Sequence, residues 1–219
     1  FDGYLGRSAV AVNGSRGSVL DLPALKGENG GFGVFGNYTS TDVTTTTYGE
    51  NLFKNQQVTY DATAETPAWT YEPVKYWSPA GHIDFLAYAP FDSNQKLKEN
   101  SKLDFTVNST ITAQKDLLWA NATNKTNGTV TFNFAHALSR LGYSVKLKDA
   151  SYESVATITL NKITLAGSTT EPTQNAFYIK GTIDLSTGNW STASSNDAKQ
   201  NFEWFDNKTS GDKTLSNKS

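Results

Sequence analysis

Apolar and polar residues alternate over short runs along most of the chain. Within Ile83–Tyr88 apolar residues occupy positions 83, 85 and 87, and Val130–Phe134 repeats the pattern at 130, 132 and 134. A period of two is typical of β-strands, because successive side chains of a strand point to opposite faces of its sheet. The predicted strands lie near Ser8–Val12, Ser18–Leu22, Gly33–Tyr38, Gln57–Ala62, Trp69–Val74, His82–Ala89, Leu103–Val107, Leu117–Ala120, Thr129–Phe134, Tyr143–Leu147, Thr157–Leu165, Ala176–Lys180 and Gly181–Leu185.

Turn residues separate these runs, as at Gly30-Gly31, Pro79-Ala80-Gly81 and Asn127-Gly128. Helical periodicity is confined to Ala135–Leu141, which Gly142 would terminate. Many short strands with regular turn signals favour a β-sandwich. The sequence therefore predicts an all-β fold with one short helix.

The composition supports this prediction and suggests a boundary. Ser, Thr and Asn are abundant, whereas charged residues make up only 18% of the chain. These polar residues compete with the helix backbone for hydrogen bonds, and Thr in particular suits strands. The segment Ser191–Ser219 is polar, with Phe202–Phe205 as its apolar cluster. We expect a β domain at residues 1–190, followed at 191–219 by a linker or the incomplete start of a second β domain.

Charge and residue chemistry narrow the function classes. A net charge of -2 argues against nucleic acid as a partner, and the absence of Cys excludes disulfides and thiol chemistry. His82 and His136 lack the spacing of a zinc motif. Asp84 and Asp116 lie in or beside strands, where a carboxylate is far more often solvated than catalytic. We expect no enzymatic activity, no catalytic residue, no metal and no cofactor.

Three ordered segments carry a resemblance to a known family. They are Asn55–Trp77, which ends in Tyr76-Trp77; Ile83–Pro90, with Ala87-Tyr88-Ala89-Pro90; and Lys115–Leu141, with Asp116-Leu117-Leu118 and His136-Ala137-Leu138-Ser139. Their order and spacing resemble the fimbrillin family of fimbrial subunits and related surface lipoproteins of Gram-negative bacteria. With further matching segments, the resemblance covers about residues 1–190.

The resemblance implies a transthyretin-like β-sandwich with Greek-key connections, about seven or more strands and export to the cell surface. Family members are outer-membrane lipoproteins or parts of extracellular fimbriae. A trypsin-like protease removes an N-terminal strand, and a strand of the next subunit takes its place. Arg7 and, as the less favoured site, Arg16 are the candidate processing sites here.

The implied partners are therefore other fimbrial subunits, by strand addition, together with host or bacterial surface ligands. No run approaches the roughly 20 apolar residues of a membrane span. Membrane contact is expected only through an N-terminal lipid anchor, which these residues do not contain, and the start at Phe1 is interpreted as a cut end.

The tryptophans support an alternative. If Trp69, Trp190 or Trp204 were exposed, its ring could stack on sugars, and the protein would be a glycan-binding surface lipoprotein module that does not polymerise. Packing within the core is the favoured role for these rings, because Trp is usually well buried.

Overall fold

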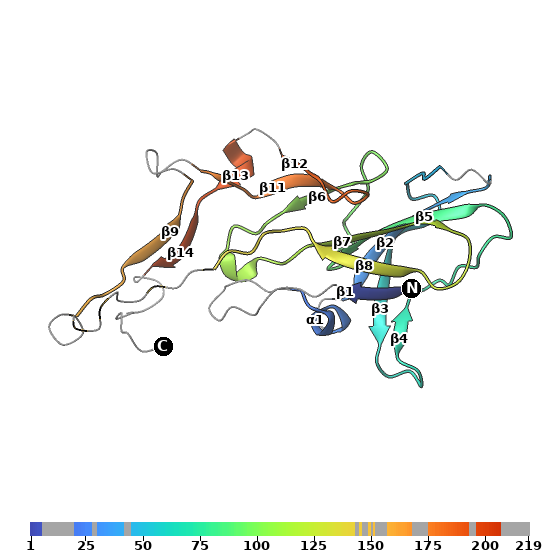
Figure 1. Cartoon of the computed structure of the whole chain (residues 1–219), viewed down its shortest axis with the longest axis horizontal. Coiled ribbons are helices and arrows are strands. Elements are labelled where there is room, and N and C mark those ends of the chain that lie inside the picture. The colour runs from blue at the N-terminus through green and yellow to red at the C-terminus, as the bar shows by residue number, and fades with distance from the viewer. Residues whose placement is uncertain are drawn as a thin grey trace.

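A β-sheet, called the central sheet below, occupies the half of the molecule that contains the N-terminus (Figure 1). The computed structural model describes residues 1–5, 20–27, 30–41, 45–142, 145, 149, 151, 157–167, 175–192 and 196–206. Over these ranges seven strands make up the central sheet. In pairing order they are β1 (Asp2–Leu5), β8 (Thr131–His136), β7 (Leu118–Lys125), β5 (His82–Ala89), β2 (Phe32–Thr39), β3 (Phe53–Asp61) and β4 (Ala68–Thr70). The pairing of β1 with β8 is parallel, and the other neighbouring pairs are antiparallel.

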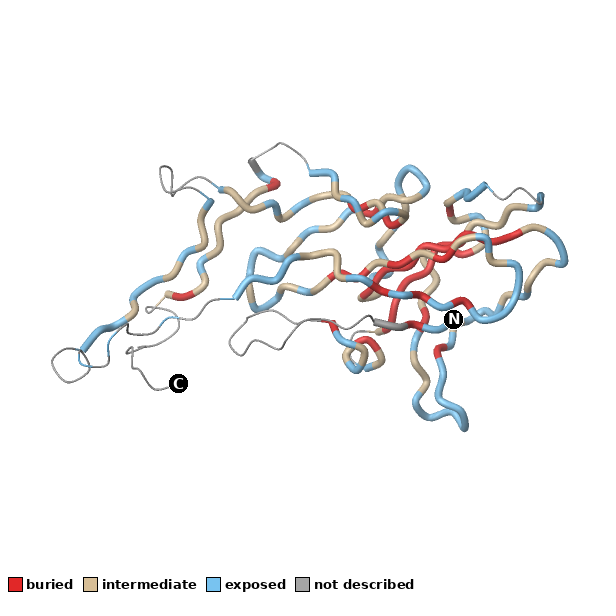
Figure 2. The backbone as a smooth tube through the Cα atoms, in the orientation of Figure 1, coloured by how far each residue is buried: buried red, intermediate tan, exposed pale blue. Residues whose placement is uncertain are grey.

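The middle strand, β5, is buried along its whole length (Figure 2). Its side chains alternate between two separate core clusters, with Phe85 and Ala87 in one and Leu86 and Tyr88 in the other. Both faces of the sheet are therefore covered at its centre, which explains why this strand carries apolar residues at nearly every position.

A second sheet covers one face. It contains β12 (Trp190–Ser191), β11 (Lys180–Asp184) and β6 (Lys102–Thr106). Leu103 of β6 and Ile183 of β11 pack with Leu86 and Tyr88 of β5, and all four side chains are at most 1% exposed. Packing of two sheets face to face is the sandwich arrangement that the sequence predicts.

The other face of the central sheet packs against a core rich in aromatic rings. Its two edge strands, β1 and β4, lie in contact with each other. The helix α1 (Leu22–Lys26) also packs here, through Leu25, which is fully buried. Asp21 begins this helix by accepting a hydrogen bond from the backbone N–H of Ala24 at 2.8 Å.

Two short strand pairs lie at the end of the molecule away from β1 (Figure 1). β9 (Lys162–Leu165) pairs with β14 (Phe202–Asp206), and β10 (Phe177–Tyr178) pairs with β13 (Lys199–Gln200), all antiparallel. Two 3-10 turns, Ile111–Ala113 and Asn196–Ala198, complete the described elements.

The predicted all-β fold with a short helix is confirmed, but the helix was predicted in the wrong place. Residues 135–141 form no helix. His136 is the last residue of β8, and the N–H of Ala137 then bonds to the carbonyl of Leu117 at 2.8 Å. Cross-strand pairing with β7 overrides the local helical pattern here. The observed helix begins instead at Leu22, where the sequence predicts the end of a strand.

Some predictions fall on residues that the structure leaves undescribed. These are the strand at Ser8–Val12 and most of the strand at Tyr143–Leu147. The boundary at residue 190 stays a prediction, although β13 and β14, which follow it, pair with β10 and β9, which precede it.

Candidate functional site

The edge strand β1 lies in a groove between β8 and β4. Asp2 pairs with Thr131 and Leu5 with Phe134, so the strand follows β8 over four residues. The N–H of Asp2 donates to the carbonyl of Val130 at 2.8 Å. A parallel pairing this short stabilises a strand weakly, so side chains must supply much of the affinity.

Phe1, directly before β1, provides the principal side-chain contact. Its ring lies among four other aromatic rings, with centroid distances of 5.5 Å to Phe53, 4.9 Å to Tyr71, 5.5 Å to Phe85 and 5.6 Å to Phe132. The pairs are edge-on, tilted or stacked, and each such contact adds attraction beyond the burial of apolar area. The ring of Phe1 therefore anchors one end of β1 in the core.

Gly3 is the second inward position of β1. A Cβ atom on Gly3 would lie 3.3 Å from Cε1 of Phe32 and 3.6 Å from both Cε2 of Phe134 and Cε2 of Trp69. Rings on β2, β8 and β4 thus approach the backbone of β1 closely. There is no space at this position for a branched side chain.

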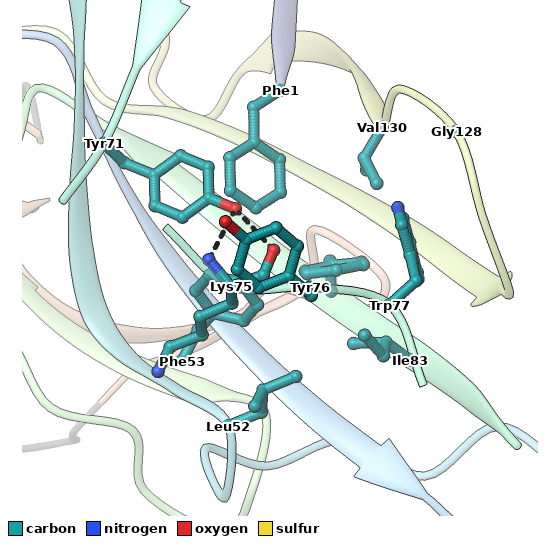
Figure 3. Close-up of a pocket in the computed structure, with 11 residues that line it drawn as sticks. Phe1, Leu52, Phe53, Tyr71, Lys75, Tyr76, Trp77, Ile83, Gly128 and Val130 are labelled. Carbon is teal, nitrogen blue, oxygen red and sulfur yellow. Dashed lines mark hydrogen bonds between the residues drawn. The ribbon is translucent and has the colours of Figure 1, made fainter. Parts of the chain in front are cut away.

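A small cavity opens beside Phe1 (Figure 3). It has a volume of about 60 Å³, and its walls include Phe1, Tyr71 and Trp77. Tyr76 also lines this cavity, and 90% of its surface is exposed. Phe1 therefore fills this part of the groove incompletely.

Comparison with known proteins identifies the family of the chain. A family model described as fimbrillin-like matches residues 26–216. The chain belongs to the fimbrillin-like family. A search of curated proteins found no match.

One solved structure shows the same fold. It is that of a fimbrial protein from Bacteroides vulgatus, to which this chain is similar with a TM-score of 0.59 and 22% sequence identity. The similarity covers 93% of this chain and 64% of the other protein, so this chain spans slightly less than two thirds of that protein's length. Among the described residues of this fimbrillin-like chain, no helix is long and apolar enough to cross a membrane.

The two predicted processing sites, Arg7 and Arg16, lie outside the described residues. Their predicted role stays a prediction. In sequence Arg7 follows the last residue of β1, Leu5, by only two positions. The strand prediction from the sequence missed β1 itself, whose four residues include a Gly and carry little strand signal.

The three candidate tryptophans are placed very differently. Trp69, on β4, is 8% exposed and packs against Phe32 and Tyr60 at centroid distances of 5.0 and 5.3 Å, so its ring is not available to a sugar. Trp190 is half-buried, and its Nε1–H donates to the carbonyl of Ala137 at 2.9 Å. Trp204 lies half-buried in the β14 strand.

The buried polar groups act as structural links. Asp84 accepts hydrogen bonds from the backbone N–H groups of Thr47 and Asn124, each at 2.8 Å, and its Oδ2 lies 3.3 Å from Nε2 of His82. Asp84 is 1% exposed, which corrects the expectation that it is solvated. Its position on a fully buried strand explains the difference.

Asp116 has a similar role. Its Oδ2 lies 2.6 Å from Nδ1 of His136 and accepts from the N–H of Leu20 at 3.2 Å. These bonds join β8 to the chain just before α1. No group of three or more acidic or His side chains that could hold a metal occurs in the described ranges.

Proposed function

We propose that this fimbrillin-like chain is a structural or adhesive subunit of a cell-surface fimbria, and that it assembles by exchanging β1 for a strand of another subunit. Membership of the family supports the first part. The geometry of β1 supports the second, because one four-residue strand covers an edge of the central sheet and part of its aromatic core. The proposal assigns no catalytic reaction to the chain.

Loss of β1 would leave two unfavourable surfaces. The edge of β8 would present unpaired backbone groups such as the carbonyl of Val130, and the ring of Phe132 would lose its cover. An open edge beside an apolar groove is a template for strand addition. Because donor and acceptor surfaces differ, such contacts run head to tail and build a filament.

A cut after Arg7 is the proposed trigger. It would sever the chain two residues beyond β1, so that β1 would be held without a covalent link, by its short pairing with β8 and by the packing of Phe1 and Gly3. We also propose that an N-terminal lipid anchors the precursor in the outer membrane, as the family resemblance implies.

The test is limited trypsin digestion of the full gene product that contains these residues. Cleavage at Arg7 is expected to convert monomer into oligomers, measured by light scattering after gel filtration and by mass spectrometry of the released peptide. The Arg7→Ala variant should stay monomeric under the same digestion, and Arg16→Ala should behave like the unmodified protein. A product cut at Arg7 that stays monomeric at high concentration would refute strand exchange.

A second candidate function, glycan binding, is favoured by one observation. Trp190 lines an apolar surface groove of about 170 Å³ together with Tyr178, which is 47% exposed, and Thr192. A ring held by its own hydrogen bond next to a second aromatic ring suits stacking on a sugar. Saturable binding on a glycan array that Tyr178→Ala abolishes would support this function, and no binding would refute it.

A further inference from the structure

The groove under β1 has two inward positions with opposite requirements. At the first, the ring of Phe1 contacts rings from β3 and β5, at 5.5 Å from both Phe53 and Phe85. Beside this ring a cavity of about 60 Å³ remains. Figure 3 shows the rings of Tyr71, Tyr76 and Trp77 gathered around this space. The position therefore accepts an aromatic side chain larger than Phe.

At the second position, two residues further along, the groove favours glycine over larger residues. The Cβ of any other residue would come within 3.3 Å of Phe32, which belongs to the buried core and is 0% exposed. Trp69 and Phe134 close the remaining sides at 3.6 Å. Additional methyl groups in a packed core force side chains and backbone apart.

The residue between these two positions does not affect which donor strand the groove accepts. Asp2 is exposed, and only its backbone is used, through the bond from its N–H to the carbonyl of Val130. Backbone pairing gives affinity without regard to sequence, whereas alternate side-chain pockets give specificity.

We propose that the groove selects a donor strand of another fimbrial subunit that runs parallel to β8 and carries an aromatic residue, Trp in preference to Phe, two positions before a glycine. This inference rests on the proposed strand exchange. β1 carries the pattern as Phe1-Asp2-Gly3, and the printed sequence contains aromatic-x-Gly elsewhere only at Tyr4-Leu5-Gly6. A donor with Trp would fill the cavity that Phe1 leaves open, which gives the incoming strand an advantage over β1.

The test is a competition for the groove of the protein cut after Arg7. A fluorescent peptide with the sequence of residues 1–7 is bound first, and unlabelled variants of it then displace it, followed by fluorescence anisotropy. Relative to the unmodified peptide, Phe1→Ala should bind about 100-fold more weakly and Gly3→Val at least about tenfold more weakly. Phe1→Trp should bind about fivefold more tightly. The matched control, Asp2→Ser, should bind within about twofold of the unmodified peptide.

The outcomes separate the two proposals. If the unmodified peptide binds but the Ala, Val and Trp variants compete equally well, strand exchange stands and the selection pattern is wrong. If Phe1→Trp binds no more tightly than the unmodified peptide, the preference for Trp is wrong. If no peptide binds to the cut protein, both strand exchange and the selection pattern fail.

Discussion

The two edges of the central sheet bury aromatic rings in the same core but are held in different ways. β4 places Trp69 against Phe32, and β1 places Gly3 against the same two rings, so the edges meet there. β4 is joined to β3 by a short turn in which Asp61 accepts hydrogen bonds from Thr63. β1 pairs with β8, which lies far away in the sequence.

This difference bears on the proposed strand exchange, because it makes β1 better suited than β4 to leave the sheet. The turn between Asp61 and Ala68 contains no Lys or Arg, and a single cut there would leave β4 attached through Tyr71. A cut after Arg7 would leave β1 with no covalent link to the sheet. A strand that is released by exchange, as proposed for β1, therefore has to be remote in sequence from its partner. A strand that stays in place, such as β4, is built from a local hairpin.

The largest expected effect is at β4. Trp69→Ala should lower the free energy of unfolding by about 3 to 5 kcal/mol, because it removes a nearly fully buried indole from the core. Urea denaturation followed by circular dichroism measures this. Tyr76→Ala is the matched control, since this ring is 90% exposed, and it should change stability by no more than about 0.5 kcal/mol. Equal losses for the two variants would contradict the assignment of Trp69 to the core.

A smaller effect is expected at β1, the edge that we propose is exchanged. Phe1→Ala should lower the free energy of unfolding by about 2 kcal/mol, because the ring is only partly buried. The loss should be local: hydrogen exchange at the amide of Asp2 should accelerate more than exchange along β5. Asp2→Ser, which changes an exposed side chain, should leave both rates unchanged. If Phe1→Ala were as destabilising as Trp69→Ala, β1 and β4 would be held equally strongly, which would contradict the difference between the two edges.

The sequence predicted the centre of the fold far better than its edges. β5 was predicted at His82–Ala89, the residues that the structure assigns to it, because Gly81 and Pro90 bound an apolar run. β1 was not predicted, because four residues with a central Gly carry little strand signal and the partner is remote in sequence. The helix at Leu22–Lys26 had a readable signal in Asp21 and Pro23, but the alternation around it was interpreted as a strand.

The candidate site was predicted only in part. The family resemblance indicated that an N-terminal strand near Arg7 matters, but the rings around β1 come from five strands, β2, β3, β4, β5 and β8, and from the loop after β4. Nothing local to Phe53, Tyr71 or Phe132 marks them as one cluster. The sequence favoured core packing for Trp69, but the rings that it meets, Phe32 and Tyr60, lie on other strands that no pattern near residue 69 identifies.

The smallest expected effect comes from the strand between the two edges. Burial raises the pKa of Tyr88 to about 12, and its Oη lies 2.7 Å from Oδ1 of Asn55 on β3 and 2.8 Å from the carbonyl of Asp92. In the unfolded chain Tyr loses its proton near pH 10, so between pH 10 and 12 the folded state holds one proton more. The contribution of the neutral phenol to the free energy of unfolding is therefore complete below pH 10 and is lost as the pH rises toward 12. At pH 11 the loss is about 1 kcal/mol. Urea denaturation at pH 9 to 11 measures the free energy of unfolding, which should decline more steeply with pH for the unmodified protein than for Tyr88→Phe. The decline that remains in Tyr88→Phe comes from other groups such as Tyr48, whose pKa is also raised by burial. Because Asn55 belongs to the β3–β4 side of the sheet, this decline should appear equally in Phe1→Ala. A decline that vanished in Phe1→Ala would mean instead that β1 depends on Tyr88.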